Sequence, residues 1–120
     1  KYDCSYHESG RENLEKASYI LQKGDGVCSH YAILTAALCR AAGLPCRIIN
    51  GPASLSDSGP RINHAWNEVL INGQWVPVDT CWDAGYTKDN TFVPAPSTRF
   101  LAPSKAVFAK THTASVITLY

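Results

Sequence analysis

Two β-rich segments joined by Asn72-Gly73 constrain the fold of this chain more than any other local feature. The segments Ile62 to Ile71 and Gln74 to Trp82 are rich in β-branched and aromatic residues. Asn-Gly is the preferred pair for the two-residue loop of a type I′ hairpin, because both loop positions need a positive φ. The sequence therefore predicts an antiparallel hairpin in which Ile71 pairs with Gln74.

The register of this hairpin brings a histidine and an aspartate to one face of the sheet. In that register Trp66 is expected opposite Asp79, and His64 opposite Cys81. Side chains alternate along a strand, so His64 and Asp79 are diagonal neighbours, at a backbone separation of about 7–8 Å. A carboxylate there can accept a hydrogen bond from the imidazole and fix its tautomer. Taken alone, this pattern fits a buried structural pair as well as it fits a catalytic base with its orienting group.

A helix is predicted from Cys28 to Ala42, followed by Gly43 as a natural stop. Apolar residues cover most of its circumference, which is typical of a central, buried helix. Cys28 occupies the first turn, directly after Gly24-Asp25-Gly26-Val27. Unpaired main-chain N–H groups and the helix dipole at such a position stabilise a thiolate, and the same N–H groups can hold an oxyanion. Cys28 is therefore a candidate nucleophile.

Other segments give weaker signals of regular structure. A short helix is expected around Glu12–Leu21, and a strand over Cys46–Gly51. Residues 52–61 have the composition of a loop, and turns are expected after Trp82. The segment Lys105–Tyr120 is compatible with either a helix or a strand.

Composition indicates one ordinary globular domain. The chain has 120 residues, of which 45% are hydrophobic and 18% are charged. A net charge of +1 gives no electrostatic reason to expect nucleic acid or an anionic membrane as a partner. No apolar run approaches the roughly 20 residues of a membrane-spanning helix. Because the chain starts at Lys1 and contains no methionine, residues 1–120 are expected to be a single catalytic domain cut from a longer protein.

The cysteine pattern does not indicate a metal site. The chain has five cysteines, Cys4, Cys28, Cys39, Cys46 and Cys81. No pair has C-x-x-C spacing, which disfavours structural zinc, and an odd number leaves at least one thiol free. Cys39 and Cys46 are interpreted as small buried hydrophobes. Cys81 is interpreted as a core residue, with a second thiol near the site as the alternative.

Taken in order, these segments resemble the transglutaminase-like superfamily, whose members share a papain-like core. The resemblance lies in Gly26–Ala32, Ala42–Arg47 with Gly51, Asn63–Asn67 and Trp75–Asp83. It covers roughly residues 24–83, while Tyr2-Asp3 and the stretch from Phe100 to His112 resemble flanking parts of such domains. The resemblance implies an α+β, papain-like transglutaminase-core fold. In that fold a central helix starts at the nucleophilic cysteine and packs on an antiparallel β-sheet.

The resemblance also implies a catalytic triad. Cys28 would be the nucleophile, His64 the general base and then the general acid, and Asp79 the group that orients His64. Family members use an aromatic side chain near the oxyanion, for which Tyr2 and Tyr6 are candidates, although a packing role is favoured for both.

Three further histidines receive no catalytic role from the sequence. His30, two residues after Cys28, is interpreted as a helix-surface residue. His7 and His112 have no local pattern around them that supports a function.

The implied activity is thiol acyl transfer at amide bonds of proteins or peptides, of the transglutaminase or cysteine-peptidase type. The expected substrate carries glutamine or another amide, and either an amine or water accepts the acyl group. A non-catalytic interaction module that retains the scaffold is the alternative. Peptide N-glycanase is a third interpretation, weakened because paired C-x-x-C motifs are missing. No cofactor or metal is expected, since no acidic cluster has calcium-loop spacing. An exported or cell-surface location is indicated by the resemblance alone.

Overall fold

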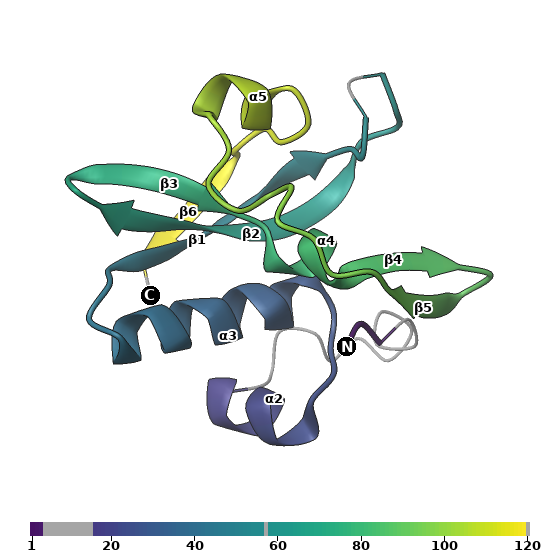
Figure 1. Ribbon diagram of the computed structural model, residues 1–120, viewed down its shortest axis with the longest axis horizontal. Coiled ribbons are helices and arrows are strands. Elements are labelled where there is room, and N and C mark those ends of the chain that lie inside the picture. The colour runs from purple at the N-terminus through teal and green to yellow at the C-terminus, as the bar shows by residue number, and fades with distance from the viewer. Residues whose placement is uncertain (4–15, 57, 120) are drawn as a thin grey trace.

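The computed structural model describes residues 1–3, 16–56 and 58–119. Its described strands form an antiparallel sheet in the order β3-β2-β1-β6, and a separate hairpin, β4-β5. Helix α3 covers one face of the sheet, α2 packs on the outer side of α3, and α5 lies on the opposite side of the sheet (Figure 1). The predicted α+β fold, with a central helix on an antiparallel sheet, is confirmed. The elements of the sheet are β1 (Cys46–Ala53), β2 (Ile62–Ile71), β3 (Gln74–Val78) and β6 (Val116–Leu119).

Helix α3 spans Cys28–Ala41 and ends where the sequence predicts. Gly43 follows with a φ of +83°, a conformation that glycine adopts without strain. The helix is less buried than expected, because only three of its residues, His30, Ala32 and Ala36, are buried and Leu38 is 54% exposed. Asn67 of β2 fixes the helix to the sheet, since its buried amide donates to the main-chain oxygen of Ala32 at 2.9 Å. This contact lies one turn after Cys28.

The hairpin of β2 and β3 has the predicted register. Ile71 pairs with Gln74, and the loop residues Asn72 and Gly73 have φ values of 50° and 76°. The prediction that the second strand continues to Trp82 is wrong, because β3 ends at Val78 and helix α4 (Thr80–Ala84) follows.

Asp79 is the reason why the strand stops. Its carboxylate oxygen Oδ1 accepts the main-chain N–H of Trp82 at 3.1 Å, which caps α4. The strand pairs expected for Trp66 with Asp79 and for His64 with Cys81 therefore do not form. Residues 62–66 of β2 consequently have no partner from β3.

Several other elements differ from expectation in length or type. Strand β1 runs to Ala53, two residues into the predicted loop. The predicted turns after Trp82 include a hairpin of β4 (Gly85–Lys88) and β5 (Thr91–Pro94), whose loop residues Asp89 and Asn90 both have positive φ. The C-terminal segment holds both a helix, α5 (Lys105–Ala109), and a strand, β6. The helix expected around Glu12–Leu21 appears as α2 (Ala17–Lys23), and its predicted start lies outside the described residues.

The sheet has an apolar core on each face. Alternation along β1 sends Ile48 toward α3 and Ile49 toward α5. The cluster under α3 is built from small and aliphatic side chains, whereas the opposite cluster is aromatic. The aromatic cluster comprises Ile49, Ala53, Trp66, Phe100 and Phe108, with Trp82 at its edge. Among the described residues, no helix is long and apolar enough to cross a membrane.

Gly51 in β1 is required by a close main-chain approach. A Cβ at this position would overlap the carbonyl oxygen of Thr113. We expect Gly51→Ala to lower the free energy of unfolding by about 2 kcal/mol, because main chain must shift to make room. Urea denaturation of both proteins measures this difference. Asn50→Ala, at an exposed position of the same strand, is the matched control and should change stability by no more than about 0.5 kcal/mol. Equal effects of the two substitutions would contradict the steric argument.

Candidate active site

A cleft of about 410 Å³ opens at the N-terminal end of α3. Cys28, His64, Cys81 and Trp82 line it, together with apolar and uncharged polar residues from positions 53–63 and from the β4-β5 hairpin. The structure therefore brings two of the predicted site residues, Cys28 and His64, into one solvent-accessible cleft.

Asp79 lies behind the cleft and holds His64. The Nε2 atom of His64 is 2.7 Å from Oδ2 of Asp79, and the Asp79 side chain is 0% exposed. The indole of Trp82 stacks on the imidazole, with ring centroids 4.2 Å apart and an interplanar angle of 20°. Since Nε2 faces Asp79, Nδ1 is the ring nitrogen left for the thiol. The His64–Asp79 contact that the sequence predicts is confirmed, although Asp79 stands at a helix start instead of in a strand.

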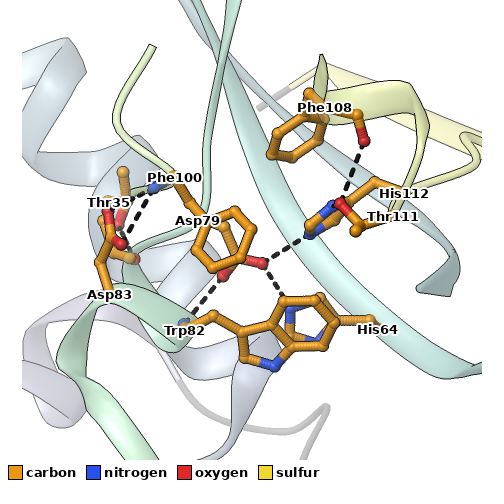
Figure 2. A network of polar contacts seen from close by, with 10 residues as sticks. Thr35, His64, Asp79, Trp82, Asp83, Phe100, Phe108, Thr111 and His112 are labelled. Carbon is orange, nitrogen blue, oxygen red and sulfur yellow. Dashed lines mark hydrogen bonds and ion pairs between the residues drawn. The ribbon is translucent and has the colours of Figure 1, made fainter. Parts of the chain in front are cut away.

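A second imidazole, that of His112, shares the same carboxylate oxygen. Its Nε2 lies 2.9 Å from Oδ2 of Asp79, and Figure 2 shows both imidazoles converging on that atom. The other nitrogen of His112 lies 2.8 Å from the hydroxyl of Thr111. The main-chain N–H of Thr113 donates to Pro52 of β1 and so brings this segment back to the sheet. Sequence reasoning missed His112, because no spacing rule connects positions 33 residues apart in different elements.

Burial and hydrogen bonding act in opposite directions on these groups. Burial lowers the pKa of His64, but hydrogen bonds with Asp79 and with the Cys28 thiol, together with their negative charges, outweigh it and raise the pKa to about 9. Burial raises the pKa of Asp79, but the hydrogen bonds from His112, His64 and the Trp82 main chain hold it below the ordinary 3.8. At neutral pH the pair is therefore an imidazolium and a carboxylate.

Cys28 is the first residue of α3, so its main-chain N–H lies in the first turn, where helices leave such groups unpaired. His30 completes this helix start: its Nδ1 accepts the main-chain N–H of Val27 at 3.0 Å. The expectation that His30 lies on the helix surface is wrong, since its side chain is fully buried. Its position within the first turn is the signal that indicates this capping role.

The remaining cysteines have free thiols wherever the structure describes them. Cys81 is buried and also borders the cleft, and burial, with the nearby Asp79 and Cys28, raises its pKa. Both interpretations of Cys81 thus hold in part: it is a core residue at the edge of the site. Cys46 is buried and Cys39 is half-buried. Cys4 lies outside the described residues.

The candidates for an aromatic side chain near the oxyanion are only partly described. Tyr2 lines the cleft together with Cys28, and its segment forms a parallel bridge to Gly26. Tyr6 and His7 lie outside the described residues. Tyr2 therefore stays the candidate that the structure places at the site.

His64, Asp79 and His112 also satisfy the spacing of a metal site. Their potential ligand atoms all lie within 4.8 Å of one another. The same atoms, both Nε2 and Oδ2, are those engaged in hydrogen bonds at 2.7 and 2.9 Å. A cation could bind here only by replacing these hydrogen bonds. The arrangement fits a network that holds protons better than it fits a set of free ligands.

This fold, with a thiol at the start of the central helix, defines the papain-like class of cysteine peptidases and acyltransferases. Within that class, the sequence model of the transglutaminase-like superfamily matches residues 1–80. The chain belongs to this superfamily, which confirms the resemblance seen in the sequence.

Two curated relatives and one solved structure are similar to the chain. Kyphoscoliosis peptidase of Mus musculus is 31% identical over 98 residues, and that of Homo sapiens is 32% identical over 92 residues. These matches cover 76% and 71% of this chain but only 15% and 14% of the relatives, so the chain spans a small part of their length. A crystal structure of a candidate cysteine protease from Cytophaga hutchinsonii is 31% identical, with a TM-score of 0.49. That match covers 56% of this chain and 22% of the other.

Proposed function

We propose that this chain catalyses acyl transfer at amide bonds of proteins or peptides through an acyl–Cys28 intermediate. Cys28 is the nucleophile, His64 the base and acid, and Asp79 the group that orients His64. The observation that carries the proposal is the His64 imidazole, placed between a fully buried carboxylate at 2.7 Å and the thiol of the cleft. An imidazolium next to a thiol favours the nucleophilic thiolate.

The proposed reaction has two steps. The Cys28 sulfur attacks the amide carbonyl carbon, and the resulting oxyanion is held by main-chain N–H groups at the start of α3. His64 gives its proton to the leaving nitrogen, the C–N bond breaks, and a thioester remains. An amine or water then attacks the thioester and passes its proton to His64. The C–S bond breaks, and the Cys28 thiolate and the imidazolium are restored.

The cleft favours uncharged substrate segments. No Asp, Glu, Lys or Arg stands among the described residues that line it, and Leu55, Ile62, Tyr86 and Phe92 contribute apolar surface. Peptides with apolar residues beside the reacting amide bury more apolar area there than charged peptides do. The peptidase name of the two relatives supports water as the acceptor, and hence hydrolysis.

Selective labelling tests the activated thiol. We expect iodoacetamide at mildly acidic pH to modify Cys28 faster than the other cysteines, because among the four cysteines that the structure describes only Cys28 is paired with an imidazolium. Mass-spectrometric mapping after limited exposure measures the modification of each cysteine. His64→Ala should remove the selectivity for Cys28. Equal labelling of all five cysteines in the unsubstituted protein would contradict the proposal.

Turnover assays then distinguish water from an amine as the acceptor, and an enzyme from a non-catalytic interaction module. Neutral glutamine peptides with apolar flanks are incubated with and without a primary amine, and products are identified by mass. Cleaved or deamidated peptide indicates water as acceptor, whereas an amine adduct indicates cross-linking. Cys28→Ala should abolish every product, while Cys81→Ala, which removes the second thiol of the cleft, should retain them. Selective labelling without any product across such peptides would favour a non-catalytic interaction module.

A further inference from the structure

We propose that His112 is a positioning residue, which holds the Asp79 carboxylate in the orientation that His64 needs by donating, uncharged, to the same oxygen. This role rests on the proposed function, in which Asp79 acts through His64. It adds to the predicted triad a fourth group, contributed by the C-terminal part of the chain.

The geometry around Asp79 leaves its carboxylate no freedom to rotate. Its Oδ1 accepts the Trp82 main-chain N–H at 3.1 Å, and its Oδ2 is 2.7 Å from Nε2 of His64 and 2.9 Å from Nε2 of His112. The side chains of Asp79 and His112 are both 0% exposed, so their contact is shielded from bulk water. Without His112, the oxygen that faces His64 would keep only one of these two partners.

The hydrogen bonds around His112 define its tautomer. An ionised carboxylate only accepts, so His112 must donate to Asp79 through Nε2–H. Its Nδ1 lies 2.8 Å from the Thr111 hydroxyl, which can donate to it. The same hydroxyl lies 3.2 Å from the carbonyl oxygen of Phe108, but that oxygen already accepts the main-chain N–H groups of Thr111 and His112. A neutral imidazole with its proton on Nε2 therefore satisfies the contacts of both ring nitrogens, with the Thr111 hydroxyl proton directed to Nδ1 and not to Phe108.

The surroundings of His112 disfavour a second positive charge. Phe108 stacks on its ring at 3.8 Å, and the neighbouring rings of Trp66 and Trp82 are within 4.9 Å of it between centroids. The titratable groups that act on it are Asp79 and His64. Burial lowers the pKa of His112, and this effect outweighs the opposite effect of Asp79, so the pKa stays below the ordinary 6.5. One carboxylate is thus paired with one imidazolium, that of His64, and with one neutral donor.

A matched pair of substitutions tests the donor function. His112→Leu removes the donor and fills its place with an apolar side chain. His112→Gln instead keeps an N–H group at the place of Nε2. The measurement is the rate of Cys28 alkylation as a function of pH. Without the donor, Asp79 is protonated at higher pH and the imidazolium of His64 loses its partner. At about pH 5 we expect His112→Leu to react about tenfold more slowly than the unsubstituted protein, and His112→Gln to react within about threefold of it.

Controls keep the test independent of folding and of turnover. Circular dichroism gives the folded fraction of each variant, to which the rates are referred. If His112→Leu does not fold, Thr111→Val takes its place, because it removes only the hydroxyl that fixes the tautomer of His112. Thr111→Val should also slow alkylation, by a smaller factor.

An unchanged pH profile in the folded Leu variant, or in Thr111→Val where Leu fails, would overturn the proposal. Equal slowing by Gln and Leu would overturn it too. Alkylation needs no substrate, so this result is separate from failure of the proposed reaction.

Discussion

Asp79→Asn is expected to lower kcat/KM by roughly 10³–10⁴-fold, the size of loss that follows when the orienting carboxylate of a triad becomes an amide. An amide can present only one acceptor oxygen. In this site both imidazoles and the Trp82 main chain donate to the carboxylate of Asp79, so at least one donor would face an NH₂ group. The charge that keeps His64 protonated is lost as well. Both effects leave His64 in the wrong tautomer or uncharged.

The measurement is the initial rate with the best peptide found in the turnover screen, supported by the rate of Cys28 alkylation near pH 6. Asp83→Asn is the matched control. Asp83 is on the same short helix, and its carboxylate accepts from the Ser97 hydroxyl at 2.7 Å and from the Phe100 main chain at 3.0 Å. The same chemical change there should reduce activity by no more than about threefold once the folded fraction is considered. If both variants lose the same activity, Asp79 acts through stability and not through His64.

The contact between His64 and Asp79 could be predicted from the sequence of one β-turn. Asn72-Gly73 sets the register of β2 and β3, and that register brings the ends of the hairpin close enough for His64 to reach Asp79. The type of structure around Asp79 could not be predicted in the same way. Its capping of α4 competes with strand pairing, and the β-rich composition up to Trp82 conceals this competition.

His112 shows what local patterns cannot supply. Its position depends on a main-chain hydrogen bond from Thr113 to Pro52, on the absence of a side chain at Gly51 and on the aromatic cluster on the α5 side of the sheet. Each of these is a tertiary contact between distant parts of the chain. The link between Cys28 and His64 is of the same kind, since it depends on how α3 packs on β2, and the sequence indicated it only through resemblance to a family.

Raising the pH through about 9 is expected to remove both turnover and the contribution of His64 to stability, because His64 then loses its proton. The folded pKa of His64, about 9, is above the 6.5 of an exposed histidine. The stabilisation is therefore fully present below about pH 6.5, declines as the pH rises, and is lost above about 9. Converted at 1.36 kcal/mol per pH unit, this difference corresponds to roughly 3 kcal/mol. Urea denaturation at several pH values should show the advantage of the unsubstituted protein over His64→Gln shrinking across this range.

Above about pH 9, the rates of turnover and of Cys28 alkylation should depend on pH in different ways. Expulsion of the leaving nitrogen needs the imidazolium proton, so kcat/KM should fall about tenfold per pH unit above about 9. Alkylation needs a nucleophilic sulfur at Cys28 but no proton donor, so its rate should not fall in the folded protein. Rates are referred to the folded fraction found in the denaturation series. A parallel decline of alkylation and turnover would show that unfolding, and not loss of the His64 proton, sets the alkaline limit.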